Sequence, residues 1–178
     1  FGDDLRMGGM LHGKILWSAH PHAEIVSIDT SDAEAMDGVA LVVTAKDVPG
    51  KNQAGIILRD QPAIAEGRVH YIGDGVAGVF AETPEIAEEA LSKIRVEYRA
   101  LPGVFSPGEA ARPDAIRVHP KGNLLHHAKI ERGDVEAAFA RCAVVVEETY
   151  TTPFIEHAFL EPEAGLALPT GEGGVTIQ

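Results

Sequence analysis

The sequence predicts an α+β fold: a mixed sheet with flanking helices, followed by an incomplete second α+β unit. Over residues 1–105, runs of apolar and β-branched residues alternate with helix-start signals in the order strand, helix, strand, strand, helix, strand. Residues 106–125 are rich in proline and glycine and indicate a linker. The remaining residues offer one short helix and two or three strands, which bury too little apolar surface to fold well alone.

The first half of the leading unit contains two strands, a helix and a third strand. Residues 11–18 and 25–30 have the composition of strands. Residues 31–34 match a capping box and predict a short helix, which Gly38 ends. Residues 39–44 form a nearly unbroken apolar, β-branched run, which is typical of a buried strand.

The second half of this unit begins with a polar loop over residues 47–61. Strands are expected at residues 69–72 and 76–82, on either side of a Gly73-Asp74-Gly75 turn. Residues 73–78 also match G-x-G-x-x-G, but a dinucleotide site needs a helix directly after the glycines, and here a strand follows. The turn is therefore the favoured interpretation, and we expect at least one of its glycines to need a positive φ. Thr83-Pro84-Glu85 then starts a helix, since threonine caps and proline takes the first helical position.

The second unit is shorter and less regular. After a strand over residues 95–98 and the linker, Gly133-Asp134 opens a short helix. Residues 143–150 are apolar and β-branched and predict a strand, while residues 164–168 and 175–178 are expected to pair across a glycine-rich turn.

Composition excludes several classes of function. The formal net charge of -12 argues against binding to nucleic acid or to anionic membrane surfaces. No apolar run approaches the roughly 20 residues of a membrane span. The first residues also lack the basic segment with which a signal peptide begins. Cys142 is the single cysteine, which excludes an internal disulfide or an all-cysteine metal site and suits the reducing cytoplasm. It lies between an expected helix and an apolar strand, so a buried structural thiol is expected.

The best candidate for a site is the segment from residue 150 to 164, where carboxylates and a histidine lie among apolar residues and prolines. His157 and Glu161 are four residues apart and would share one face of a helix; with Glu156 and Glu163 they could bind a metal or perform acid–base chemistry. Pro162 breaks a helix there, so an extended segment with structural hydrogen bonds is the favoured alternative. The pairs His20/His22 and His126/His127 lack a third ligand at a recognisable spacing. The sequence shows no complete catalytic constellation.

Eight motifs in order resemble the large subunit of molybdenum hydroxylases, the xanthine dehydrogenase and aldehyde oxidoreductase family. They span essentially the whole chain and are the segments at residues 1–5, 18–25, 27–29, 36–39, 46–52, 69–77, 96–102 and 152–162.

The resemblance implies an α/β hammerhead domain over residues 1–110, a linker over 111–125 and the beginning of a molybdopterin-binding domain over 126–178. It implies oxidative hydroxylation of a purine, another N-heterocycle or an aldehyde with water-derived oxygen, in a longer subunit that binds molybdenum and molybdopterin. Iron–sulfur clusters and FAD would belong to partner domains or subunits. Catalytic, cofactor-binding and metal residues are expected downstream of Gln178, so the 178-residue chain should be inactive alone.

Two other hypotheses come from different classes. One is a free-standing hammerhead module for binding or assembly without catalysis. The other is a small hydrolase or metal enzyme that uses His157, Glu156 and Glu161. The length of the open reading frame distinguishes the leading hypothesis from the first of these.

Overall fold

The computed structural model describes residues 2–161, 163–171 and 173–178. These residues form two units: a core unit, Gly9–His127, and a tail unit, which joins the N-terminal residues up to Gly8 to Ala128–Gln178. Phe1, Pro162 and Glu172, which the sequence interpretation used, lie outside the described residues. The domain boundaries at residues 110 and 125 stay a prediction.

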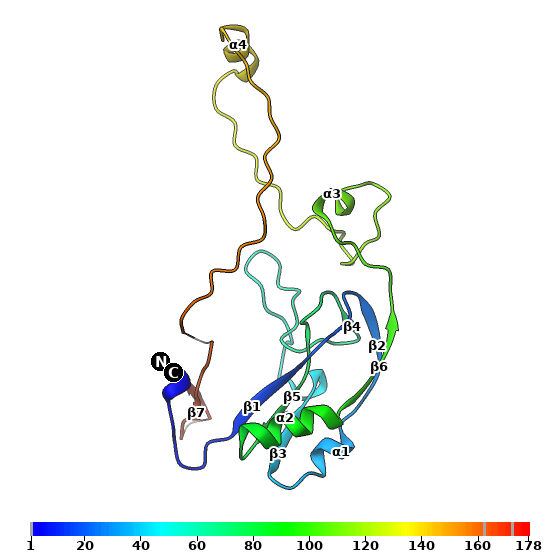
Figure 1. Cartoon of the computed structure of the whole chain (residues 1–178), viewed down its shortest axis with the longest axis vertical. Helices are drawn as coiled ribbons and strands as arrows, with labels where there is room; N and C mark the ends of the chain where they lie inside the picture. Colours follow the sequence, from blue (N-terminus) through cyan, green and yellow to red (C-terminus); the bar gives the residue numbers. More distant parts are fainter. Residues whose placement is uncertain (1, 162, 172) are drawn as a thin grey trace. The chain divides into compact units, whose positions relative to one another are not determined.

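The core unit contains two three-stranded sheets, in which every adjacent pair of strands is antiparallel. The first has the order β1-β5-β3 and the second the order β4-β2-β6 (Figure 1). Their bounds are β1 His12–Trp17, β2 Ala23–Asp29, β3 Val39–Val43, β4 Arg68–Val69, β5 Gly75–Ala81 and β6 Arg95–Ala100. The α+β class is therefore confirmed, with the strands close to their expected positions.

Helix α2, Pro84–Lys93, packs against the sheet that contains β1 and β5 and against α1, Ser31–Glu34 (Figure 1). It starts as the sequence predicts: Thr83 Oγ1 accepts a hydrogen bond from the third backbone N–H, and proline occupies the first turn. Its buried face meets the sheet in a core of small and branched side chains, which comprises Ala33, Val42, Ala77, Val79, Ala81, Ala87, Ala90 and Ile94.

The expected capping box at the start of α1 is wrong. The N-cap is Thr30, whose side chain makes no cap hydrogen bond, while Ser31 lies inside the helix and donates to Asp29 Oδ1 over 2.6 Å. A capping box is present instead between Thr44 and Asp47, around the 3₁₀ helix η2, Ala45–Asp47. The linker also contains a one-turn helix that the sequence interpretation missed, α3, Pro107–Ala110.

The tail unit contains η1 (Gly2–Asp4), α4 (Val135–Ala140) and the hairpin of β7 (Ala167–Pro169) and β8 (Val175–Ile177). The pairing of the last two strands is confirmed. Residues 143–150 are not a strand: within the described residues they have no partner strand, and a strand needs one to satisfy its backbone. Their valines are exposed, Val146 at 81%. Cys142 is exposed too, contrary to the expectation of a buried thiol.

Candidate functional site

The segment that contains His157 and Glu161 is extended and exposed, so the two side chains do not share a helix face. The His157 ring stacks on Phe159, with 5.6 Å between centroids. Glu161 Oε1 instead accepts a hydrogen bond from the backbone N–H of Gly2 over 3.3 Å. Glu156 Oε1 accepts from Ala158 N over 3.1 Å, next to a left-handed φ of 49° at Ala158.

These contacts are structural: those of His157 and Glu156 are with residues two positions away, whereas Glu161 bonds to Gly2, far away in the sequence. Across the described residues, no three or more histidine, cysteine, aspartate or glutamate side chains are grouped so that they could hold a metal ion. The small metal enzyme built on His157 and Glu161 therefore gains no support from geometry, and their roles near a site stay a prediction.

The Gly73-Asp74-Gly75 turn is tied to the end of β1 by backbone bonds. Ser18 N donates to Asp74 O over 2.8 Å, and Gly73 N donates to Ser18 O over 2.9 Å. Gly73 has φ +95°, which confirms that one glycine of the turn needs a positive φ. Strand β5 follows directly, so the G-x-G-x-x-G match does not open a helix and lacks the geometry of a dinucleotide site.

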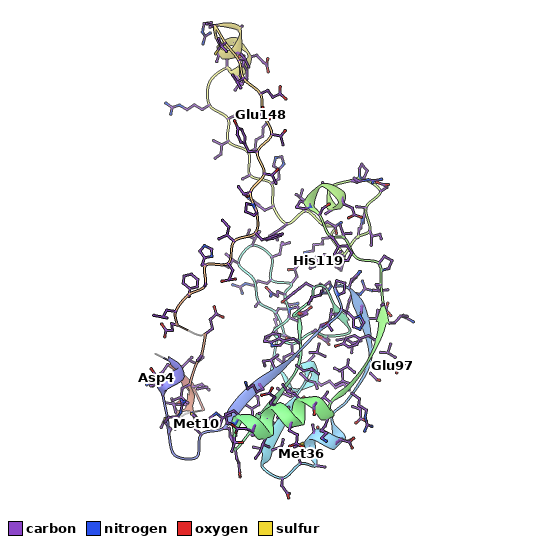
Figure 2. All side chains as sticks on the ribbon, viewed as in Figure 1. Asp4, Met10, Met36, Glu97, His119 and Glu148 are labelled. Carbon is purple, nitrogen blue, oxygen red and sulfur yellow. The ribbon has the colours of Figure 1, made fainter. Side chains whose placement is uncertain are left out.

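The turn places Asp74 beside a row of histidines inside the core unit. Asp74 is 3% exposed, and its Oδ2 accepts from the backbone N–H of His70 over 3.1 Å. The His70 ring stacks on His119, with centroids 4.8 Å apart and planes 6° apart, and its centroid lies 6.3 Å from that of His22. Figure 2 shows His119 in the part of the core unit that lies away from α2.

His22 has a fixed tautomer. Its Nδ1 lies 2.7 Å from Pro102 O, and because a carbonyl oxygen can only accept, Nδ1 carries the hydrogen and donates it. The Nε2 lone pair then remains, on a ring that is 3% exposed, without a hydrogen-bond partner. The neighbouring His20 packs its ring on Tyr98 at 4.7 Å, and burial raises the pKa of Tyr98.

A cavity of about 620 Å³ lies against the histidine row. Its wall combines an apolar loop with the polar cluster and comprises Gly55, Ile56, Ile57, Leu58, Asp60, Gln61, Pro62, His70, Tyr71, Asp74, His119 and Leu125. Burial lowers the pKa of His70; the positive charge that His119 can carry lowers it further, and the Asp74 carboxylate partly opposes both effects.

Sequence reasoning missed this cluster. It flagged His22 only as one of a local pair, and it treated the segments that contain His70 and His119 as a strand and a linker. These three histidines are far apart in sequence, so no local spacing links them; only the antiparallel pairing of β2 with β4 and the path of the chain after β6 bring them together.

Comparison with known protein families defines the class of the chain. The model described as "Aldehyde oxidase and xanthine dehydrogenase, a/b hammerhead domain" matches residues 1–102. The model described as "Molybdopterin cofactor-binding domain" matches residues 118–178. The chain therefore belongs to the aldehyde oxidase and xanthine dehydrogenase a/b hammerhead family, as its motifs indicate.

Individual relatives agree with this assignment. The chain is 53% identical over 174 residues to a probable xanthine dehydrogenase subunit from Bacillus subtilis, covering 98% of the chain and 23% of that protein. It is 41% identical to the nicotinate dehydrogenase large molybdopterin subunit of Eubacterium barkeri, over 99% of the chain and 42% of that protein. The crystal structure of the aldehyde oxidoreductase from Desulfovibrio desulfuricans superimposes with a TM-score of 0.89 at 32% identity, over 99% of this chain and 21% of that one.

Within the described part of the stretch matched to the cofactor-binding domain no residue is buried, so these residues do not by themselves enclose a molybdopterin. The stretch matched to the cofactor-binding domain contributes α4, the β7–β8 hairpin and extended segments, and its described acidic side chains and histidines do not converge. Gln178 exchanges both backbone hydrogen bonds with Leu166, at 3.0 Å each, and so continues the hairpin. Among the described residues, no helix is long and apolar enough to cross a membrane.

Proposed function

We propose that this chain is the N-terminal portion of the molybdenum-binding subunit of a molybdenum hydroxylase. The observation that carries the proposal is the match of two consecutive family models, in the order hammerhead then cofactor-binding domain, on a fold that follows an aldehyde oxidoreductase over 99% of the chain. The chain spans only 23% and 42% of two of its relatives, so the bulk of such a subunit would lie outside it.

The proposed activity of the whole protein is oxidative hydroxylation of an N-heterocycle or an aldehyde. The names of the relatives support this class, since they are a xanthine dehydrogenase subunit, a nicotinate dehydrogenase subunit and an aldehyde oxidoreductase. Within it, the proposed role of the core unit is structural, because its two sheets and α2 enclose a packed hydrophobic core. Catalytic and cofactor-binding residues are proposed to follow Gln178.

The proposed partners are the remainder of the subunit and separate iron–sulfur and flavin domains or subunits. The subunit names of the relatives support an assembly of several chains. The proposed compartment is the cytoplasm, because the one cysteine, Cys142, is a free and exposed thiol that oxidising compartments seldom retain.

The test compares two proteins from one expression host that makes the molybdenum cofactor. The continuous reading frame, co-expressed with its neighbouring subunit genes, should contain stoichiometric molybdenum and oxidise one of xanthine, nicotinate or an aldehyde with an artificial electron acceptor. The 178-residue chain is the matched control and should contain no molybdenum. Stoichiometric molybdenum in the short chain, or none in the long one, would overturn the proposal.

A further inference from the structure

Two stacked imidazoles connect the loop after α3 to the rest of the core unit. The loop, residues 111–123, carries His119, whose ring lies parallel to that of His70 at 4.8 Å. His70 follows β4 directly, and its side chain is 21% exposed. Each ring would carry a positive charge when protonated, and at this separation two such charges repel.

The loop is closed by its own hydrogen bonds. Asn123 Nδ2 donates to Ala110 O over 3.2 Å and to Ile116 O over 2.8 Å, while its Oδ1 accepts from Val118 N over 2.9 Å. These bonds lie within the loop or join it to α3. They contain no titratable group, so they do not respond to mild acid.

The groups around His70 decide whether it accepts a proton. Asp74 favours the proton, with Oδ2 3.9 Å from His70 Nδ1, but this carboxylate already accepts the backbone N–H of His70. His22 and His119 flank the ring, Arg68 lies two residues before it, and Asp60 lines the same cavity. Arg68 faces Glu24, at 3.5 Å.

We propose that the His70–His119 stack is a pH-sensitive latch, which holds the loop of residues 111–123 on the core unit at neutral pH and releases it in mild acid. Both rings line the cavity of about 620 Å³, together with Leu125 just after the loop. Release of the loop therefore removes part of the cavity wall, and acid changes access to the cavity.

The direction of the pH dependence follows from linkage. In the docked state, burial and then His119 lower the pKa of His70 below its ordinary value of 6.5. His70 binds the proton more readily once the loop is released, so docking is complete above that value and is lost as the pH falls through and below it. Each unit of difference in pKa between the two states lowers the ratio of docked to released loop by up to about tenfold.

The test measures the position of the loop in the whole 178-residue chain by electron–electron distance spectroscopy. Spin labels on Arg117→Cys and Glu88→Cys, with Cys142→Ser to remove the native thiol, report the distance between the loop and α2, because both labelled positions are exposed. The distance distribution should be narrow at pH 7.5 and should lose at least half of its narrow component at pH 5.0.

Two variants isolate the stack. His119→Phe keeps an aromatic ring on His70 without a charge, so its narrow component should fall clearly less between pH 7.5 and pH 5.0 than that of the wild type. His126→Phe, an exposed histidine outside the loop, is the matched control and should keep the wild-type response. In the unmodified chain, imidazole NMR signals of His70 should titrate below 6.5 and shift upward in pH when His119 is replaced.

Three results would overturn the latch. The first is a wild-type distance distribution that is the same at pH 5.0 and 7.5, and the second is a distance distribution of His119→Phe that broadens in acid as much as that of the wild type. The third is loss of the far-UV circular dichroism signal of the whole chain at pH 5.0. The last would show global unfolding rather than local release. If His119→Phe does not fold, independent titration of His70 and His119 in the unmodified chain would be sufficient to reject the proposal.

Discussion

Replacement of Gly73 by alanine tests the turn that positions Asp74 and His70. Gly73 has φ +95°, which L side chains rarely adopt, and a Cβ added there would meet no atom within 4 Å. The cost is therefore backbone strain alone, about 1–2 kcal/mol of unfolding free energy. For a unit of this size, that corresponds to a fall in Tm of roughly 4 °C per kcal/mol.

Gly75→Ala is the matched control, two residues away in the same turn. Gly75 has no positive φ, and an added Cβ would make ordinary contacts, at 3.4 Å to Ile15 Cγ2 and 3.5 Å to Trp17 Cζ3. We expect its unfolding free energy to stay within about 0.5 kcal/mol of the wild type.

The assay is urea unfolding followed by the fluorescence of Trp17, the single tryptophan, which lies in β1. Both variants should keep the wild-type m-value, since the surface exposed on unfolding does not change. The reasoning would be refuted if Gly73→Ala and Gly75→Ala lowered the midpoint equally, or if Gly73→Ala left it unchanged.

Three further variants test the cap, the core and a charged turn. Thr83→Ala should lower the unfolding free energy by about 1 kcal/mol through loss of the N-cap bond of α2, and serine there should restore most of it in urea titrations. Val79→Ala, at a fully buried site, should cost on the order of 2 kcal/mol, whereas Val144→Ala, 77% exposed, should cost less than about 0.5; equal costs in thermal melts would contradict the described core. Hydrogen bonds from Thr44 lower the pKa of Asp47 below its ordinary value of 3.8, so the stabilisation they provide is present above that value and is lost as the pH falls. Asp47→Asn should therefore reduce the fall of the unfolding free energy with decreasing pH, and an unchanged pH dependence would exclude the interaction.

Local patterns in the sequence determined the class of the fold and most element positions. Thr83-Pro84 indicated the start of α2, and the apolar run before Thr44 indicated the position of β3, because cap chemistry and β-branched composition lie in neighbouring residues. The expected burial of this strand was wrong, since β3 lies at the edge of its sheet and Leu41 is 53% exposed. The family motifs likewise predicted the class of protein that the comparisons define.

Tertiary structure decided the rest. The 143–150 run has strand composition, yet composition cannot supply a hydrogen-bonding partner, and none lies within the described residues. The row of His22, His70 and His119 exists because strand pairing and the path after β6 join distant segments, and no local spacing encodes such a meeting. Sequence thus determined what each segment could become, while packing decided which segments meet, since a contact depends on both partners and on the chain between them.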